Sequence, residues 1–131
     1  MITRFLLFGV IGWCLEILWT GFGSLIRGDF RMTSRTSIWM FFIYGTGALF
    51  QPLIYNLLKY PLFIRGSIYV LCIFLAEFIF GYIMSRAQAC PWDYSHAKLN
   101  VMGIIRLDYA PVWFAVGILF EYAHLRLDSL I

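Results

Sequence analysis

Four long apolar runs dominate this chain of 131 residues and limit what it can fold into more than any other feature. A helix that crosses the hydrocarbon core of a bilayer needs about 20 mostly apolar residues. Runs of that kind lie at about residues 3–26, 37–58, 65–85 and 110–127. Turn and breaker residues separate them, among them Gly28 and Pro61. We therefore predict an all-α fold, a four-helix transmembrane bundle.

The composition favours lipid over water as the solvent for most of the chain. Hydrophobic residues make up 62% and charged residues 13%, and the mean hydropathy is +0.81. A soluble domain is about half apolar and a quarter charged. The net charge is only +3, and the basic residues are scattered singly, so we expect the lipid bilayer and no nucleic acid as a partner. We predict one polytopic domain over residues 1–131, multi-pass and integral to the membrane (the cell membrane if the source is bacterial).

Two places depart from a plain series of helices. Pro52 lies late in the second run and is expected to kink that helix. The connection at residues 87–109 is long, and its apolar and polar residues alternate. We expect this third loop to pack against the bundle or to lie at the membrane interface, rather than to extend into water.

Three acidic residues lie near the middle of predicted helices: Glu16, Glu77 and Glu121. A carboxylate at the centre of a span costs about 3 kcal/mol on insertion scales, so such residues face the interior and usually mark a site. The structural alternative is that each is protonated and hydrogen-bonds a neighbouring helix. We favour function, because three such residues are more than packing requires.

Small and polar residues recur at three- and four-residue steps on all four helices, as in the stripe of Gly12, Glu16 and Thr20. The second helix contributes Tyr44 and Gln51. These faces could surround one shared polar centre at mid-membrane depth. We predict that the three carboxyls, Tyr44 and Gln51 bind a cation, a proton or a small polar solute there.

The third loop holds a second group of candidates, Asp93, His96 and Asn100. One interpretation makes the loop a lid or headgroup-binding surface, with Asp93 and Asn100 shaping the mouth of the site. The other is structural: Asp93 makes turn bonds, and Arg106 pairs with Asp108. Both interpretations stay open at this point.

Several signals are weak or absent. Glu121 and His124 have the Glu-x-x-His spacing of some metal sites, but a hydrogen-bonded histidine is the commoner explanation, so we expect neither metal nor cofactor. The sequence has no phosphate-binding glycine loop, nucleophile elbow or HExxH motif.

The leading hypothesis is therefore binding or transport of a cation, proton or small polar solute. A membrane-embedded lipid-modifying enzyme is an alternative, in which Asp93 and His96 would supply acid–base chemistry; we lean against an enzyme. An accessory subunit of a larger membrane complex is another. Because so small a chain rarely encloses a pathway alone, we expect a homodimer or a partner membrane subunit.

Sequence motifs also carry a resemblance. The run ACPWDYS at residues 89–95 is followed by Asn100, Gly103, Tyr109, Pro111 and Trp113. Gly12 and Trp13 precede Glu16, and SIWMFFIYG occupies residues 37–45. This pattern resembles the putative ABC-transporter type IV permease family, also called CmpB-like, and resembles most closely its transmembrane protein 229-like members.

The resemblance implies a small helical membrane protein, and the family label implies a permease that works with a separate ATP-binding partner. It singles out Glu16, Glu77, Asp93, Asn100 and Glu121. Bacterial members carry an Asn-Arg-Gly run in the first loop, where this chain reads TSRT at residues 33–36. A role that rests on that asparagine is therefore not transferred.

Overall fold

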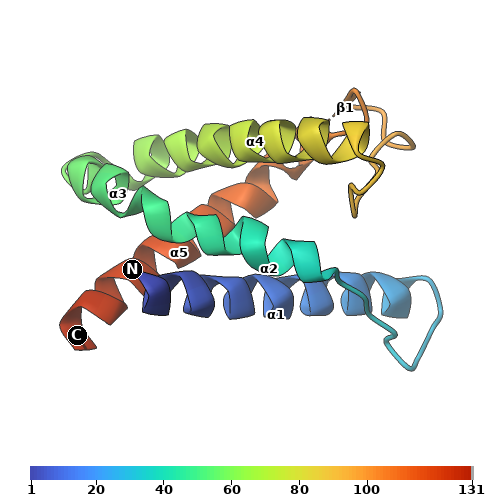
Figure 1. Cartoon of the computed structure of the whole chain (residues 1–131), viewed down its shortest axis with the longest axis horizontal. Helices are drawn as coiled ribbons and strands as arrows, with labels where there is room; N and C mark the ends of the chain where they lie inside the picture. The colour runs from blue at the N-terminus through green and yellow to red at the C-terminus, as the bar shows by residue number, and fades with distance from the viewer. Residues whose placement is uncertain (131) are drawn as a thin grey trace. The chain divides into compact units, whose positions relative to one another are not determined.

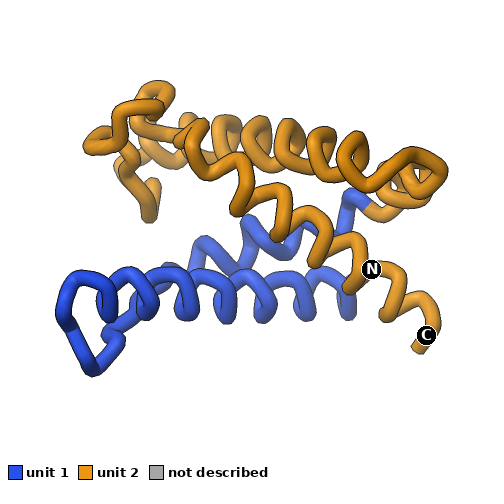
Figure 2. Tube along the Cα trace, turned by 180° about the vertical axis from the view of Figure 1, so that it is seen from behind, with its two compact units in different colours: residues 1–50 blue, residues 51–131 orange. Residues whose placement is uncertain are grey.

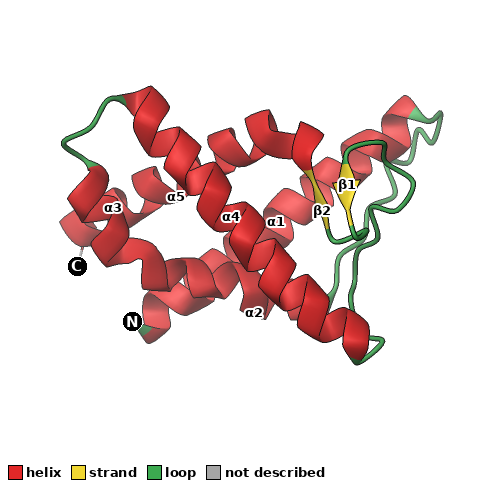
Figure 3. Cartoon of the chain, turned by 90° about the horizontal axis from the view of Figure 1, so that it is seen from above, coloured by secondary structure: helices red, strands yellow, loops and turns green. Residues whose placement is uncertain are grey.

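Helices form most of the computed structural model, which describes residues 1–130 (Figures 1 and 3). The elements are α1 (Ile2–Ile26), α2 (Ile38–Gly45), the 3-10 helix η1 (Thr46–Phe50), α3 (Gln51–Leu57), α4 (Leu62–Arg86), β1 (Asn100–Val101), β2 (Ile105–Arg106), the 3-10 helix η2 (Leu107–Tyr109) and α5 (Ala110–Leu130). The predicted all-α class is confirmed, and β1 and β2 form one short antiparallel hairpin inside the third loop.

Within residues 1–130, three helical stretches are long and apolar enough to cross a membrane: Ile2–Ile26, Ile38–Leu57 and Leu62–Arg86. The helix predicted at residues 110–127 also forms and extends to Leu130. It falls outside this set because Glu121, His124 and Arg126 lower its hydropathy. The composition and these helices identify a membrane protein.

Backbone contacts divide the chain into two compact units, Met1–Phe50 and the residues from Gln51 onward (Figure 2). In the first unit, α1 packs along α2 through glycines. A Cβ atom at Gly9 would overlap the Phe41 ring, and one at Gly12 would overlap Tyr44. Glycine is needed at these positions because the helices approach closely enough for aromatic rings to lie on the backbone.

The second predicted helix is interrupted, and the interruption begins before Pro52. Regular α-helix ends at Gly45, and a 3-10 stretch follows to Phe50. Pro52 is the second residue of α3, where its fixed φ is favourable but its missing N–H leaves the carbonyl of Ala48 without a helical partner. The tighter 3-10 bonding absorbs this loss upstream of the proline, so a kink at Pro52 alone was too simple a prediction.

In the second unit, α4 packs against α5 through two more glycines. A Cβ at Gly66 would overlap the Phe114 ring, and one at Gly117 would overlap the Cβ of Tyr69. The opposite face of α4 is an exposed apolar stripe at four-residue steps: Leu71, Leu75, Ile79 and Ile83. The helix therefore separates a packed face from a face suited to lipid. It begins at Leu62 rather than residue 65, because extended Pro61 serves as its N-cap.

Candidate functional site

Each of the three carboxyls in the helices accepts a hydrogen bond from a tyrosine phenol. The donor–acceptor distances are 2.9 Å for Tyr44–Glu16, 2.6 Å for Tyr69–Glu121 and 3.2 Å for Tyr94–Glu77. Each carboxyl or its tyrosine also lies beside a glycine packed tightly against a neighbouring element: Gly12, Gly117 and Gly81. The glycine lets the neighbouring segment approach closely, and the tyrosine then reaches the acid.

Glu16 lies on α1 one turn after Gly12, and its side chain is half-buried. Tyr44 belongs to the last turn of α2, where long side chains point back toward the helix N-terminus. With its Cβ and ring lying on Gly12, Tyr44 directs its hydroxyl to Oε1 of Glu16. Among the described residues, Tyr44 is the hydrogen-bond partner of this carboxyl, so Glu16 has a neutral neighbour and no ion pair.

Glu121 has a different environment, since Arg65 neutralises it. The Arg65 guanidinium donates from Nε to Oε2 at 2.9 Å and from Nη2 to Oε1 at 3.1 Å. Tyr69, one turn further along α4, donates to Oε2. The Glu121 side chain is 8% exposed and that of Arg65 18%. A two-point pair this well covered holds α4 to α5 and keeps the charge on Glu121 compensated.

The sequence analysis did not identify Arg65 as the partner of Glu121, because Arg65 lies at the boundary of a predicted helix, where a basic residue is expected at the membrane interface. One signal could have found it. An in-span glutamate needs a counter-charge, and Arg65 shares a face with Tyr69 at i+4 on the neighbouring helix.

Glu77 is covered by the third loop. Tyr94 donates to Oε2 of Glu77, and Oε1 is buried. One turn later on α4, Gly81 lies against Ile104 and the Trp92 ring. The loop therefore packs against α4, which is one of the two placements that the sequence suggested.

The structure does not bring Glu77 and Glu121 together. They bind different partners, and Arg65, which holds Glu121, precedes Glu77 by twelve residues, about 18 Å along α4. Glu16 belongs to the other compact unit. The predicted single polar centre is thus wrong for the two carboxyls of the second unit, which form two separate sites.

Of the remaining predicted residues, Asn100 and Asp93 make hydrogen bonds within the third loop. Asn100 accepts from the Gly103 N–H and donates to the carbonyl of Ala97, which closes the hairpin turn. Asp93 is exposed and accepts from the Ser95 N–H at 2.9 Å, a bond that holds the pKa of Asp93 below its ordinary value. Gln51 is half-buried at the start of α3. Asp93 thus makes the turn bond that the structural interpretation described.

Arg106 pairs with Asp108 through Nε at 2.9 Å, as the sequence suggested, and this bond lowers the pKa of Asp108. Both lie in the third loop, outside the long apolar helices.

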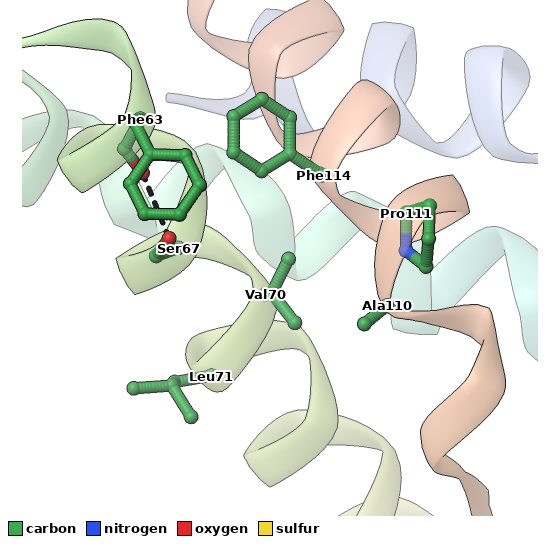
Figure 4. Close-up of a pocket in the computed structure, with 7 residues that line it drawn as sticks. All are labelled: Phe63, Ser67, Val70, Leu71, Ala110, Pro111 and Phe114. Carbon is green, nitrogen blue, oxygen red and sulfur yellow. Dashed lines mark hydrogen bonds between the residues drawn. The ribbon is translucent and has the colours of Figure 1, made fainter.

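A surface groove of about 630 Å³ lies between α4 and α5 (Figure 4). Its walls are almost entirely apolar, and Ser67, its polar member, donates its hydroxyl to the Phe63 carbonyl. The lining residues are Phe63, Ser67, Val70, Leu71, Ala110, Pro111 and Phe114. None of the predicted site residues lines this groove, so it is not the polar cavity that the sequence suggested.

Comparison with known proteins identifies a family. The model of the family described as "Putative ABC-transporter type IV" matches residues 3–130, nearly the whole chain. No solved structure matches the chain significantly.

Proposed function

Because the chain belongs to the putative ABC-transporter type IV family, we propose that it is a multi-pass membrane transport component in which Glu16 binds a proton or a small cation. One observation carries this proposal. Glu16 is half-buried in an apolar helix. Among the described residues, its carboxyl is hydrogen-bonded by the neutral phenol of Tyr44.

An isolated carboxylate in a span is costly, and the cost falls when a positive charge or a proton joins it. Glu121 already has Arg65, so a proton or cation arriving there would have to displace a two-point ion pair. Glu16 has no such competitor within the described residues. The neutral environment therefore makes Glu16 the better exchange site.

Tyr44 suits this role, because a phenol both donates and accepts. It stabilises ionised Glu16 by donating to it, and it remains a partner when the carboxyl carries a proton. Gly12 fixes the approach of the tyrosine, so the geometry is maintained while the charge changes.

The multi-pass arrangement rests on three apolar helical stretches. We include α5 as a fourth crossing, in which Glu121 is paired with Arg65 of α4. Asp93 and Asn100 shape the mouth of the pathway by folding the third loop. A homodimer would supply a second copy of Glu16. The closer likeness to the transmembrane protein 229-like members belongs to the same proposal and rests on the WDYS run at residues 92–95.

Proton movement into proteoliposomes tests the role of Glu16. Purified protein would be reconstituted with a pH-sensitive dye inside, and a potassium diffusion potential would drive protons inward. We expect uptake by the wild type and loss of uptake in Glu16→Gln, which keeps the shape of the side chain but cannot ionise.

The control adds Gln51→Glu to the Glu16→Gln variant, which places a carboxyl at another half-buried position, on α3. We expect this double variant to show no uptake. Equal uptake by wild type and Glu16→Gln would contradict the proposal. Repeating the assay with a sodium-sensitive dye separates a proton from a small cation.

A second candidate follows from the family description, namely a permease subunit driven by a separate ATP-binding protein. The sequence lacks a phosphate-binding glycine loop, so ATP would have to be bound by another chain. Purification in mild detergent should then recover an ATPase at a fixed ratio to this chain, and a monodisperse preparation of this chain alone would count against it.

A further inference from the structure

The third loop contains a small folded element with its own hydrogen bonds. The Tyr94 N–H donates to the Gly103 carbonyl, the Leu107 N–H to the Leu99 carbonyl, and the hairpin pairs Asn100 with Arg106. The Trp92 indole donates to the carbonyl of Ile104 at 2.8 Å. Because these bonds lie within the loop, residues 90–109 can keep their shape whether or not they rest on α4.

This element lies against the C-terminal part of α4, and Figure 1 draws β1 near that end of the helix. Trp92 and Ile104 pack on Gly81, and Tyr94 donates to Glu77. Of these contacts, the bond from Tyr94 is the polar one. Breaking it would remove this bond to the carboxyl and leave the hydrogen bonds within the loop in place.

Glu77 lies nine residues before the end of α4, which is about 14 Å along the helix. Helix residues on the other face of α4 at this depth are exposed and apolar, as Leu75 and Ile79 show. The third loop thus covers Glu77 on the side where Tyr94 binds the carboxyl.

We propose that residues 90–109 act as a lid over Glu77 and that Tyr94 is the gate residue, controlling access of protons and small cations from the aqueous phase to this carboxyl. The proposal concerns Glu77 and does not depend on exchange at Glu16. It assigns Tyr94 a positioning role, through the hydrogen bond that keeps the lid closed.

Chemical modification of Glu77 tests the lid. The full chain in liposomes would be treated with a water-soluble carbodiimide and glycine methyl ester. The carboxyl forms an amide with the amine, and the carbodiimide leaves as a urea. Mass spectrometry would then measure the adduct at Glu77 against that at exposed Asp93.

We expect Glu77 to react far more slowly than Asp93 in the wild type. Tyr94→Phe should raise the rate at Glu77 by about two- to tenfold, the range that loss of one hydrogen bond gives. Tyr122→Phe is the control, since it removes a phenol that is 55% exposed on α5 and bonded to Arg126, and it should leave the rate unchanged.

An unchanged rate in Tyr94→Phe, or a wild-type Glu77 that reacts as fast as Asp93, would overturn the proposal. Ile104→Ala provides a second variant, which loosens the contact with Gly81 and keeps the tyrosine. It should also raise the rate at Glu77. Because the assay needs no transport, its failure is distinct from a failure of Glu16→Gln to affect uptake.

Discussion

The α1–α2 pair and the α4–α5 pair each accommodate a glutamate carboxyl within an apolar helix, but they do so in different ways. Each has a glutamate in a helix, a tyrosine that donates to it, and a glycine against which that tyrosine packs. They differ in one residue, because Arg65 neutralises Glu121 and no described cation neutralises Glu16. The comparison teaches that a carboxylate with a fixed counter-charge joins helices, whereas one with a neutral partner remains able to take up a proton or cation.

The largest expected effect comes from breaking the ion pair of the second unit. Arg65→Leu leaves the well-covered Glu121 carboxyl without its counter-charge, and we expect the free energy of unfolding to fall more than in any other variant of this comparison. Unfolding of purified protein in mixed detergent micelles would measure it.

The double variant Arg65→Leu, Glu121→Leu is the control for that prediction. Removing both charges leaves neither one unpaired, so the double variant should be more stable than the single one. If the two are equally destabilised, the pair is not what joins α4 to α5.

The glycines test whether close approach matters equally in the two regions. Gly12→Ala and Gly117→Ala each place a Cβ where the partner tyrosine already lies. We expect each to cost about 1–3 kcal/mol, the range for overpacking, in the same unfolding assay. Gly28→Ala would not serve as a control, since Gly28 has a positive φ of 99°. Ala115→Gly, at an exposed position on α5, is the better reference and should cost no more than about 1 kcal/mol.

The tyrosines sharpen the comparison with a smaller effect. Tyr44→Phe removes the described partner of the Glu16 carboxyl, while Tyr69→Phe leaves Glu121 with both bonds from Arg65. Each should cost about 1 kcal/mol in stability. Infrared spectra should nevertheless show a larger shift of the carboxyl band for Tyr44→Phe. Equal shifts would mean that the arginine does not distinguish the sites.

The smallest effect is the response of the third loop to acid. Arg106 and the Ser95 N–H lower the pKa values of Asp108 and Asp93. A group whose pKa is depressed in the folded state contributes stability above its unfolded pKa, and that contribution is lost as the pH falls through the folded value. Proteolysis within residues 90–109 should therefore speed up slightly below about pH 4, and less so in Asp108→Asn.

Much of this fold could be predicted from periodicity and composition. The apolar runs located the helices to within a few residues, and the small-and-polar faces predicted for the first two helices contain Gly12, Glu16 and Tyr44, which lie where α1 and α2 meet. The break in the second helix was predicted at Pro52, whereas the change from α-helix to 3-10 helix occurs upstream, over Thr46–Phe50.

The site was harder to predict, since a single sequence indicates which residues share a helix face but not which residues on other elements they contact. Three inward carboxyls suggested one centre, yet Glu121 pairs with Arg65 and Glu77 with a tyrosine of the loop. Tyr94 lies seventeen residues from Glu77 in the sequence, in a connection with no helical period. Only the folded loop brings them together.

Infrared difference spectroscopy of the purified protein tests the central claim most directly, that Glu16 exchanges a proton whereas Glu121 is held in an ion pair with Arg65. Spectra would be collected across about pH 4 to 9, a range wide enough for carboxyls in different environments, for wild type, Glu16→Gln and Glu121→Gln. The account predicts a protonated-carboxyl band that changes with pH and disappears in Glu16→Gln but persists in Glu121→Gln. A pH-dependent band that survives in Glu16→Gln and disappears in Glu121→Gln would contradict it.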